Sequence, residues 1–143
     1  QGDASVAAGW IVEQARSARA AAGVVGPPIC LVAGGETTVR VSGNGKGGRN
    51  QELALAAAVD MAVGKDERAR LVCLATDGRD GPTDSAGALV EWDSVGRAQA
   101  VGLDARKHLD NNDSYPFFSA LGDLIISGPT GTNVNDLLFW CWY

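Results

Sequence analysis

The chain is organised around the sequence GNGKGGRNQE, residues 43–52, where a glycine-rich loop runs into an alanine-rich apolar segment. Residues 51–63 have the composition of a helix, and Asn50 is placed to cap its start. Glycine lets the backbone approach a ligand closely, because it has no Cβ atom. The free N–H groups at the helix start favour an anion, and Lys46 and Arg49 add positive charge there. The junction therefore predicts a phosphate or carboxylate site, and the alternative is a plain flexible hairpin tip.

This junction differs from the two common phosphate-binding fingerprints. No Ser or Thr follows Lys46, as a Walker A loop requires, and the glycine spacing is not that of a Rossmann dinucleotide site. The anion-binding prediction therefore depends on the glycines, the cations and the helix start together.

Outward from the junction, short apolar runs alternate with helical segments, as in an α/β layer fold. Residues 29–33 and 71–75 are continuous apolar runs, typical of strands buried on both faces. Residues 37–41 alternate like a half-buried strand and predict a hairpin with 29–33. We expect a layered sandwich with a mixed, largely parallel sheet flanked by helices, in one domain over residues 1–143. The other expected elements are helices at 4–22, 94–101, 104–110 and 114–121 and strands at 123–127 and 137–143.

The composition limits the class of function and the compartment. Apolar residues make up 45% of the chain and charged residues 20%, which is ordinary for a globular protein. The net charge of −5 argues against a nucleic-acid partner, and no apolar run is long enough for a membrane span. Cys30, Cys73 and Cys141 lie in apolar runs, so we expect buried, reduced thiols and a cytoplasmic protein. The chain opens on Gln1, so we expect it to be a piece of a longer protein.

Three polar loops beside apolar strands carry the groups suited to chemistry. They are residues 34–38 with the glycine loop, residues 76–84, and residues 128–136. In open α/β sheets, ligands bind where such loops follow the strands. Asp77 and Asp80 share one loop, and each either faces a cavity or satisfies N–H groups of that loop. For Asp77, directly after a buried strand, we favour a functional role.

Other residues leave two interpretations open or favour a structural one. Thr130 and Thr132 fit a turn and a phosphate-binding loop equally well. His108 is interpreted as a solvated surface residue, and the aromatic cluster at 140–143 as core or as a contact in a homo-oligomer. A single histidine and no cysteine–histidine cluster give no sign of a zinc-type metal site.

Four motifs resemble the glycerate 2-kinase family, in the same order and spacing, over nearly the whole chain from about Gly34 onward. They fall in the carboxyl-terminal region of that family, called the MOFRL domain. Residues 1–28 are similar, more loosely, to the helix that enters this domain. The motifs are GGETTV at 34–39, GKGGRNQE at 45–52, TDG at 76–78 with DGPT at 80–83, and GPTGTNVND at 128–136.

The resemblance implies phosphorylation of D-glycerate to 2-phosphoglycerate, with ATP and Mg²⁺ as cofactors. Members of the family are two-domain cytosolic proteins, with the active site in the cleft between an amino-terminal Rossmann-like domain and this one. The amino-terminal kinase domain brings a catalytic lysine, and nothing in this chain corresponds to it. Some relatives carry the older label hydroxypyruvate reductase, which we set aside because no dinucleotide fingerprint appears here.

Carried over residue by residue, the resemblance implies that Arg49 and Asp77 are catalytic. Arg49 would hold the transferring phosphoryl group or the substrate carboxylate through a bidentate fork. Asp77 would be the base that accepts the glycerate hydroxyl proton or a Mg²⁺ ligand, and the sequence does not separate these roles. Phosphoryl transfer needs mainly positioning and charge neutralisation. The further substrate- or phosphate-binding residues expected are Glu36, Thr37, Lys46, Gly47, Gly48, Asn50, Thr76, Gly78, Asp80, Thr132 and Asn133.

Two rival functions stay open. The first is a kinase of the same architecture that acts on another small hydroxy acid, because the loops alone do not define the acid. The second is a stand-alone anion-binding or regulatory module without kinase activity. A substrate panel tests the first rival, and the gene region upstream of this chain tests the second.

Overall fold

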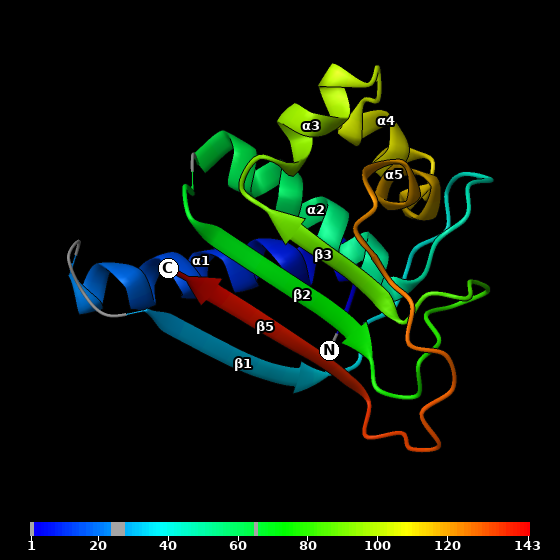
Figure 1. Ribbon diagram of the computed structural model, residues 1–143, viewed down its shortest axis with the longest axis horizontal. Helices are drawn as coiled ribbons and strands as arrows, with labels where there is room; N and C mark the ends of the chain where they lie inside the picture. Colours follow the sequence, from blue (N-terminus) through cyan, green and yellow to red (C-terminus); the bar gives the residue numbers. More distant parts are fainter. Residues whose placement is uncertain (1, 24–27, 65) are drawn as a thin grey trace.

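A computed structural model describes residues 2–23, 28–64 and 66–143 of the chain. Its five-stranded sheet has the order β1-β5-β2-β3-β4, and every neighbouring pair of strands is antiparallel (Figure 1). The α/β class is confirmed, and the expectation of a largely parallel sheet is wrong. The strands are β1 (Ile29–Gly35), β2 (Ala69–Ala75), β3 (Gly87–Glu91), β4 (Leu124–Ile125) and β5 (Asp136–Trp142).

The last strand of the chain lies between the first two, and this insertion makes the β1–β5–β2 part of the sheet antiparallel. β5 pairs with β1 along its whole length, so that Gly35 lies opposite Asp136, and it pairs with β2 on its other side. Residues 37–41 form no strand. Thr38 makes a single bridge to Asp3, so the expected hairpin with β1 is also wrong.

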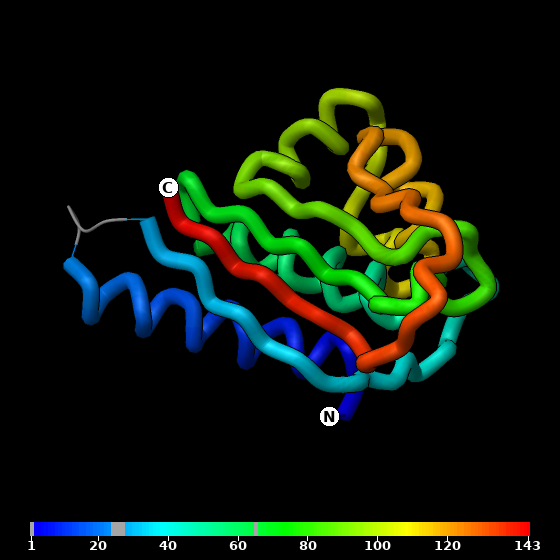
Figure 2. The backbone as a smooth tube through the Cα atoms, turned by 60° about the horizontal axis from the view of Figure 1, so that its bottom comes forward, coloured from blue at the N-terminus to red at the C-terminus, as the bar shows by residue number. Residues whose placement is uncertain are grey.

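Helices α1 and α2 cover one face of the sheet, and three shorter helices pack outside α2 (Figures 1 and 2). Side chains alternate along β1, β5 and β2, with Trp140 and Leu71 buried under the helices and Val32 63% exposed on the other face. The expectation that residues 29–33 are buried on both faces is therefore wrong. The helices are α1 (Ala4–Ala22), α2 (Arg49–Gly64), α3 (Ser94–Ala100), α4 (Ala105–Asp110) and α5 (Ser114–Leu121).

Helix α2 is the central element of the packing. Every residue from Asn50 to Val59 is buried, because the helix contacts the sheet, α1 and the three shorter helices. Its alanines allow these close approaches on all sides. The N-terminal end of α2 is therefore buried too, and its backbone N–H groups need partners from elsewhere in the protein. No helix of the described residues is long and apolar enough to cross a membrane.

Candidate functional site

The predicted loops meet at one end of the sheet, around the start of α2 (Figure 1). The loop after β2 reaches α2 through Asp80, which accepts hydrogen bonds from the backbone of Asn50 and Gln51. The loop before β5 reaches α2 through the ion pair of Arg49 with Asp136. The sequence therefore identified segments that are distant along the chain and adjacent in space.

Asp80 occupies the anion position at the start of α2. Its two carboxylate oxygens accept the backbone N–H groups of Asn50, at 3.0 Å, and Gln51, at 2.9 Å, and both side-chain amides also donate to it. Burial raises the pKa of Asp80, and these four hydrogen bonds oppose that shift. Asp80, which is 0% exposed, is therefore the cap of this helix in place of Asn50. This placement supports the structural interpretation of Asp80 and leaves its carboxylate closed to a ligand.

The glycines before α2 allow neighbouring segments of the protein to pack closely against the loop. A Cβ atom on Gly48 would lie 2.3 Å from Cγ of Asp80, and one on Gly47 would lie 2.1 Å from Oγ of Ser114. Gly43 and Gly45 approach the backbone of residues 111–113 in the same way. None of these four glycines has a positive φ. Close packing against neighbouring segments thus accounts for the glycine run, without a ligand.

Arg49 is held by a bidentate ion pair. Nε donates to Oδ2 of Asp136 at 2.6 Å and Nη2 donates to Oδ1 at 2.7 Å. The side chain of Asp136 is 4% exposed and that of Arg49 is 27% exposed. The hydrogen bonds to Asp136 raise the pKa of Arg49, so the guanidinium stays charged. The fork expected for a ligand is therefore directed at Asp136, and Nη1 makes no hydrogen bond within the described part of the chain.

A cavity of about 410 Å³ lies beside Arg49, and Thr37, Gly47 and Gly48 also line it. A smaller cavity of about 100 Å³ is lined by Glu36 and Asp136. The exposed Glu36 also contributes to the raised pKa of Arg49, after the larger effect of Asp136. A rigid cation at the wall of an open cavity is suited to binding an anion.

Lys46 lies at the edge of the same loop and is exposed. Its ammonium lies 4.3 Å from the ring centroid of Tyr115, a cation–π distance. Its backbone N–H donates to Oδ1 of Asp113. Lys46 is therefore oriented by α5, and its ammonium remains accessible from solvent.

Thr76 joins the loop after β2 to the loop before β5. Its hydroxyl donates to the carbonyl of Asn135 at 2.7 Å and accepts from the N–H of Val134 at 2.8 Å. Gly78 has φ +87°, and a Cβ there would lie 2.0 Å from the carbonyl oxygen of Gly128, so only glycine permits this contact. The two loops therefore form one unit at the end of the sheet.

Three predicted residues of this unit retain exposed or partly exposed side chains. Oδ1 of the half-buried Asp77 accepts the N–H of Arg79, as in an Asx-turn, and Oδ2 has no hydrogen bond among the described residues. The N–H of Thr132 donates to Thr130, and Oδ1 of Asn133 accepts the N–H of Asn135. The turn interpretation accounts for these bonds, and contact of the three side chains with substrate stays a prediction.

The sequence pattern of the MOFRL family matches residues 29–136. The chain belongs to the MOFRL family. It is 52% identical over 111 residues to the D-glycerate 2-kinase of Thermotoga maritima, covering 78% of this chain and 26% of that protein. It is 45% identical over 113 residues to the glycerate 2-kinase of Pyrococcus horikoshii, covering 78% of this chain and 25% of that protein. The chain thus spans about a quarter of the length of these curated relatives.

Solved structures agree with the family assignment. The crystal structure of glycerate kinase from Thermotoga maritima matches 99% of this MOFRL chain and 34% of that chain, with a TM-score of 0.89 and 41% identity. The PH0495 protein from Pyrococcus horikoshii matches 97% of this chain and 31% of its own, with a TM-score of 0.86 and 39% identity. The resemblance found in the sequence motifs is confirmed by these matches.

Two further residues, Asn112 and Glu52, hold the glycine loop against α2, and their role was not predicted from the sequence. Oδ1 of Asn112, which has φ 54°, accepts the N–H groups of Ser42 and Gly43 at 2.8 and 2.9 Å. Its Nδ2 donates to Oε1 of Glu52 at 2.9 Å. Burial raises the pKa of Glu52 to about 6. The polar run at 111–113 after a short helix was the available signal for a special turn.

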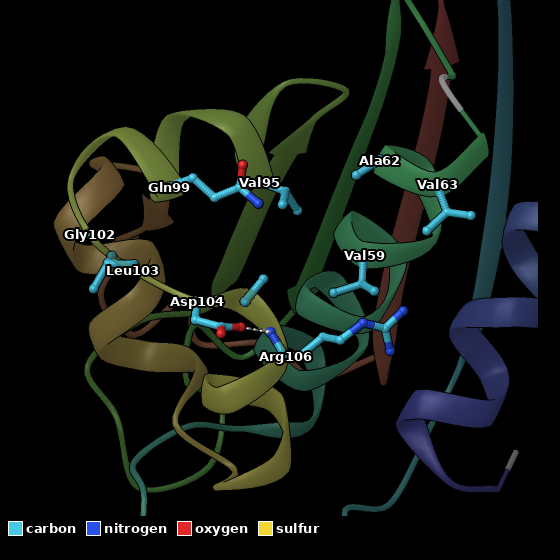
Figure 3. A pocket seen from close by; sticks show the side chains of 10 residues that line it. Val59, Ala62, Val63, Val95, Gln99, Gly102, Leu103, Asp104 and Arg106 are labelled. Atoms are coloured by element: carbon cyan, nitrogen blue, oxygen red, sulfur yellow. Dashed lines mark hydrogen bonds between the residues drawn. The ribbon is translucent and has the colours of Figure 1, made fainter.

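A second concavity of the MOFRL chain lies away from these loops. A groove of about 530 Å³ between α2, α3 and α4 is lined mainly by apolar side chains, among them Val59, Val95 and Leu103 (Figure 3). Oδ1 of Asp104 in this groove accepts the backbone N–H of Arg106 and caps α4. None of the predicted site residues lines the groove, so the Arg49 region is the better candidate site.

Proposed function

We propose that this MOFRL chain takes part in the ATP-dependent phosphorylation of D-glycerate to 2-phosphoglycerate. The observation that carries the proposal is the 52% identity to D-glycerate 2-kinase over 78% of this chain. The MOFRL family match over residues 29–136 contains all four motif loops. The chain spans about a quarter of that relative. In this proposal it supplies one wall of an interdomain cleft, and an amino-terminal kinase domain supplies the other.

In this proposal Arg49 is the main cation for phosphoryl transfer. Asp136 holds two of its nitrogens, so the guanidinium is positioned before the substrate arrives. Nη1 then donates to the transferring phosphoryl group or to the glycerate carboxylate. A preorganised donor stabilises developing charge more than a mobile one, because it loses no orientation in the reaction.

Asp77 would act on the glycerate hydroxyl, as the base that accepts its proton, or would bind Mg²⁺. Its Oδ2 fits either role, because no described residue donates a hydrogen bond to it. No group of three or more His, Cys, Asp or Glu side chains in the described chain has the arrangement of a metal site. In kinases Mg²⁺ is usually held by one or two carboxylates together with substrate phosphates, so Asp77 would be the protein's contribution to such a site. When bound, Mg²⁺ would neutralise charge on those phosphates.

The test is Arg49→Ala in the natural full-length protein, with kcat and KM measured for D-glycerate and Mg·ATP. We expect a loss in kcat/KM equivalent to at least about 3 kcal/mol, the size of losing one well-placed donor. Arg16→Ala is the matched control, because Arg16 also donates to a buried carboxylate, that of Asp66, but lies on α1. It should lower the melting temperature and leave kcat unchanged.

Wild-type turnover and Michaelis constants in Arg49→Ala would overturn the assignment of Arg49. A panel of small hydroxy acids tests the substrate separately. If another acid gives a higher kcat/KM than D-glycerate, the kinase assignment stands and the substrate is wrong. Absence of ATP-dependent phosphorylation of any acid by the folded full-length protein would favour a binding or regulatory module.

A further inference from the structure

The pairing of β1 with β5 places two cysteines side by side. Cys30 and Cys141 are direct partners in the antiparallel register, and their Sγ atoms lie 3.3 Å apart. Both are free thiols, Cys30 exposed and Cys141 half-buried, so the expectation that all three cysteines are buried is wrong. They lie on the sheet face opposite α1 and α2, since their neighbours Leu31 and Trp140 point into the core.

The backbone geometry at this pair is suited to a disulfide. Directly opposed residues in antiparallel strands have Cα atoms about 4.5–5.5 Å apart, within the range of about 4.4–6.8 Å found in disulfides. The two Sγ atoms are already in contact, so side-chain rotation suffices to bring them to bonding distance. No change in the strand register is needed.

The surroundings give the two thiols different roles. Burial is the largest effect on Cys141 and raises its pKa, and the neighbouring Cys30 raises it further. The guanidinium of Arg70, opposite Cys141 on β2, opposes this shift. Arg70 is held by an ion pair with Glu91 at 2.6 Å and by the ring of Tyr143. Cys30 is the more exposed thiol and is the one that an external reagent reaches first.

We propose that Cys30 and Cys141 form a modification site that low-molecular-weight disulfides of the glutathione type convert to an intramolecular disulfide. The thiolate of Cys30 attacks one sulfur of the reagent and releases one thiolate, leaving a mixed disulfide. The thiolate of Cys141 then attacks the Cys30 sulfur and releases the second. The two protein thiols are oxidised by two electrons, the reagent is reduced to two thiols, and the protons of the cysteines end on them.

The disulfide would tie the edge strand β1 to β5 across 111 residues of sequence. A cross-link over so long a loop restricts the unfolded chain and so favours the folded state. At the other ends of β1 and β5, Gly35 lies opposite Asp136, and Asp136 forms the ion pair with Arg49. Oxidation thus fastens the two strands that support the candidate site, whatever reaction that site performs.

The test incubates the natural full-length protein with oxidised glutathione and maps the peptides without reduction. We expect one cross-linked peptide pair containing Cys30 and Cys141, no retained glutathione, reversal by dithiothreitol and a higher melting temperature. Cys73, fully buried with a pKa well above its usual range, should react with an alkylating reagent only after denaturation. Cys73→Ser is the matched control and should form the same cross-link.

The single variants test the order of the two steps. Cys141→Ser should retain one glutathione on Cys30, because the resolving thiol is missing. Two outcomes would overturn the proposal in the wild-type protein, whose folding needs no variant. One is a stable mixed disulfide at Cys30 without the cross-link, and the other is failure of both thiols to react while the exposed thiol of a model peptide does.

Discussion

The start of α2 and the loop before β5 lie next to each other, but they are held in opposite ways. At the start of α2, Asn50, Gln51 and Asp80 are all within 2% of complete burial and bind each other through side chains. Residues 131–135 before β5 are all exposed, and Thr76 and Thr130 hold them mainly through backbone groups. The buried contacts at the start of α2 therefore hold that end of the helix in place. The exposed residues 131–135 include polar side chains that are accessible to a ligand.

This difference separates residues that build the site from those that act in it. A buried polar group without a partner costs stability, so changes at the start of α2 should appear in unfolding experiments. Changes at exposed loop residues should leave stability nearly unchanged and alter activity. Arg49 belongs to both regions, because it begins α2 and is paired with Asp136 of β5.

The largest expected effect distinguishes the two aspartates of one loop. Asp80→Ala removes the cap of α2 and leaves buried donors of Asn50 and Gln51 without partners, so we expect a loss of about 3–4 kcal/mol of stability. Asp77→Ala is the matched control, with a loss below about 1 kcal/mol and an inactive full-length enzyme. Urea unfolding and kcat measure the two effects. Equal stability losses in Asp80→Ala and Asp77→Ala would contradict the distinction between a buried structural aspartate and a partly exposed functional one.

The next largest effect is expected at Asn112, whose side chain holds the start of the glycine loop. Asn112→Gly keeps the left-handed backbone at φ 54° but removes the acceptor for Ser42 and Gly43 and the donor to Glu52, so we expect a loss of about 2 kcal/mol. The neighbouring exposed Asn111 also accepts one backbone N–H, that of Asn44, and Asn111→Gly should cost below about 1 kcal/mol. Thermal melts of both variants test this. Equal melting temperatures of Asn112→Gly and Asn111→Gly would contradict the structural role of Asn112.

A third prediction uses pH. The folded pKa of Glu52, about 6, lies above its ordinary value of 4.5 because burial disfavours the carboxylate, with Asp3 adding to the shift. The folded state therefore binds this proton more tightly, and stability from Glu52 is present at low pH and lost as pH rises from 4.5 to 6. Glu52→Gln keeps an acceptor for Asn112 and should be more stable than wild type at pH 7 by about 2 kcal/mol.

Unfolding curves of wild type and Glu52→Gln between pH 4 and pH 7.5 measure this difference directly. Other carboxylates titrate in the same range, but they are common to both proteins and cancel in the comparison. A stability difference that stays constant across this range would show that Glu52 has an ordinary pKa in the folded protein.

The smallest expected effect on stability lies in the exposed loop. Thr130→Val removes the hydroxyl that donates to the carbonyl of Thr76 at 2.5 Å and should cost below about 1 kcal/mol. In the full-length enzyme it should raise KM several-fold, because the loop loses one of its anchors. Ser127→Ala, which removes a local exposed hydrogen bond to Gly128, is the control and should change neither quantity. A stability loss as large as that of Asp80→Ala would contradict the comparison.

Much of the local structure was predictable from the sequence. The helices at 4–22 and 51–63 and the strands at 71–75 and 137–143 agree with the structure within about two residues, because their patterns are local. β3 was missed, since Gly87 and Ala88 make a weak strand signal. The pairing of strands was wrong, because it depends on the insertion of β5, which no local pattern records.

The sequence by itself determined the family, the four motif loops and the approximate positions of most helices. These follow from residue types at short spacing, where backbone preference and apolar periodicity act. Only the tertiary structure decided which partners the charged groups have. Arg49 was predicted to be catalytic, and Asp80 was predicted either to bind substrate or to satisfy N–H groups of its loop. In the structure Asp80 caps α2 and Arg49 is held by Asp136. The reason is physical: a buried charge takes the partner that the packing brings to it, and packing joins segments that lie far apart in the chain.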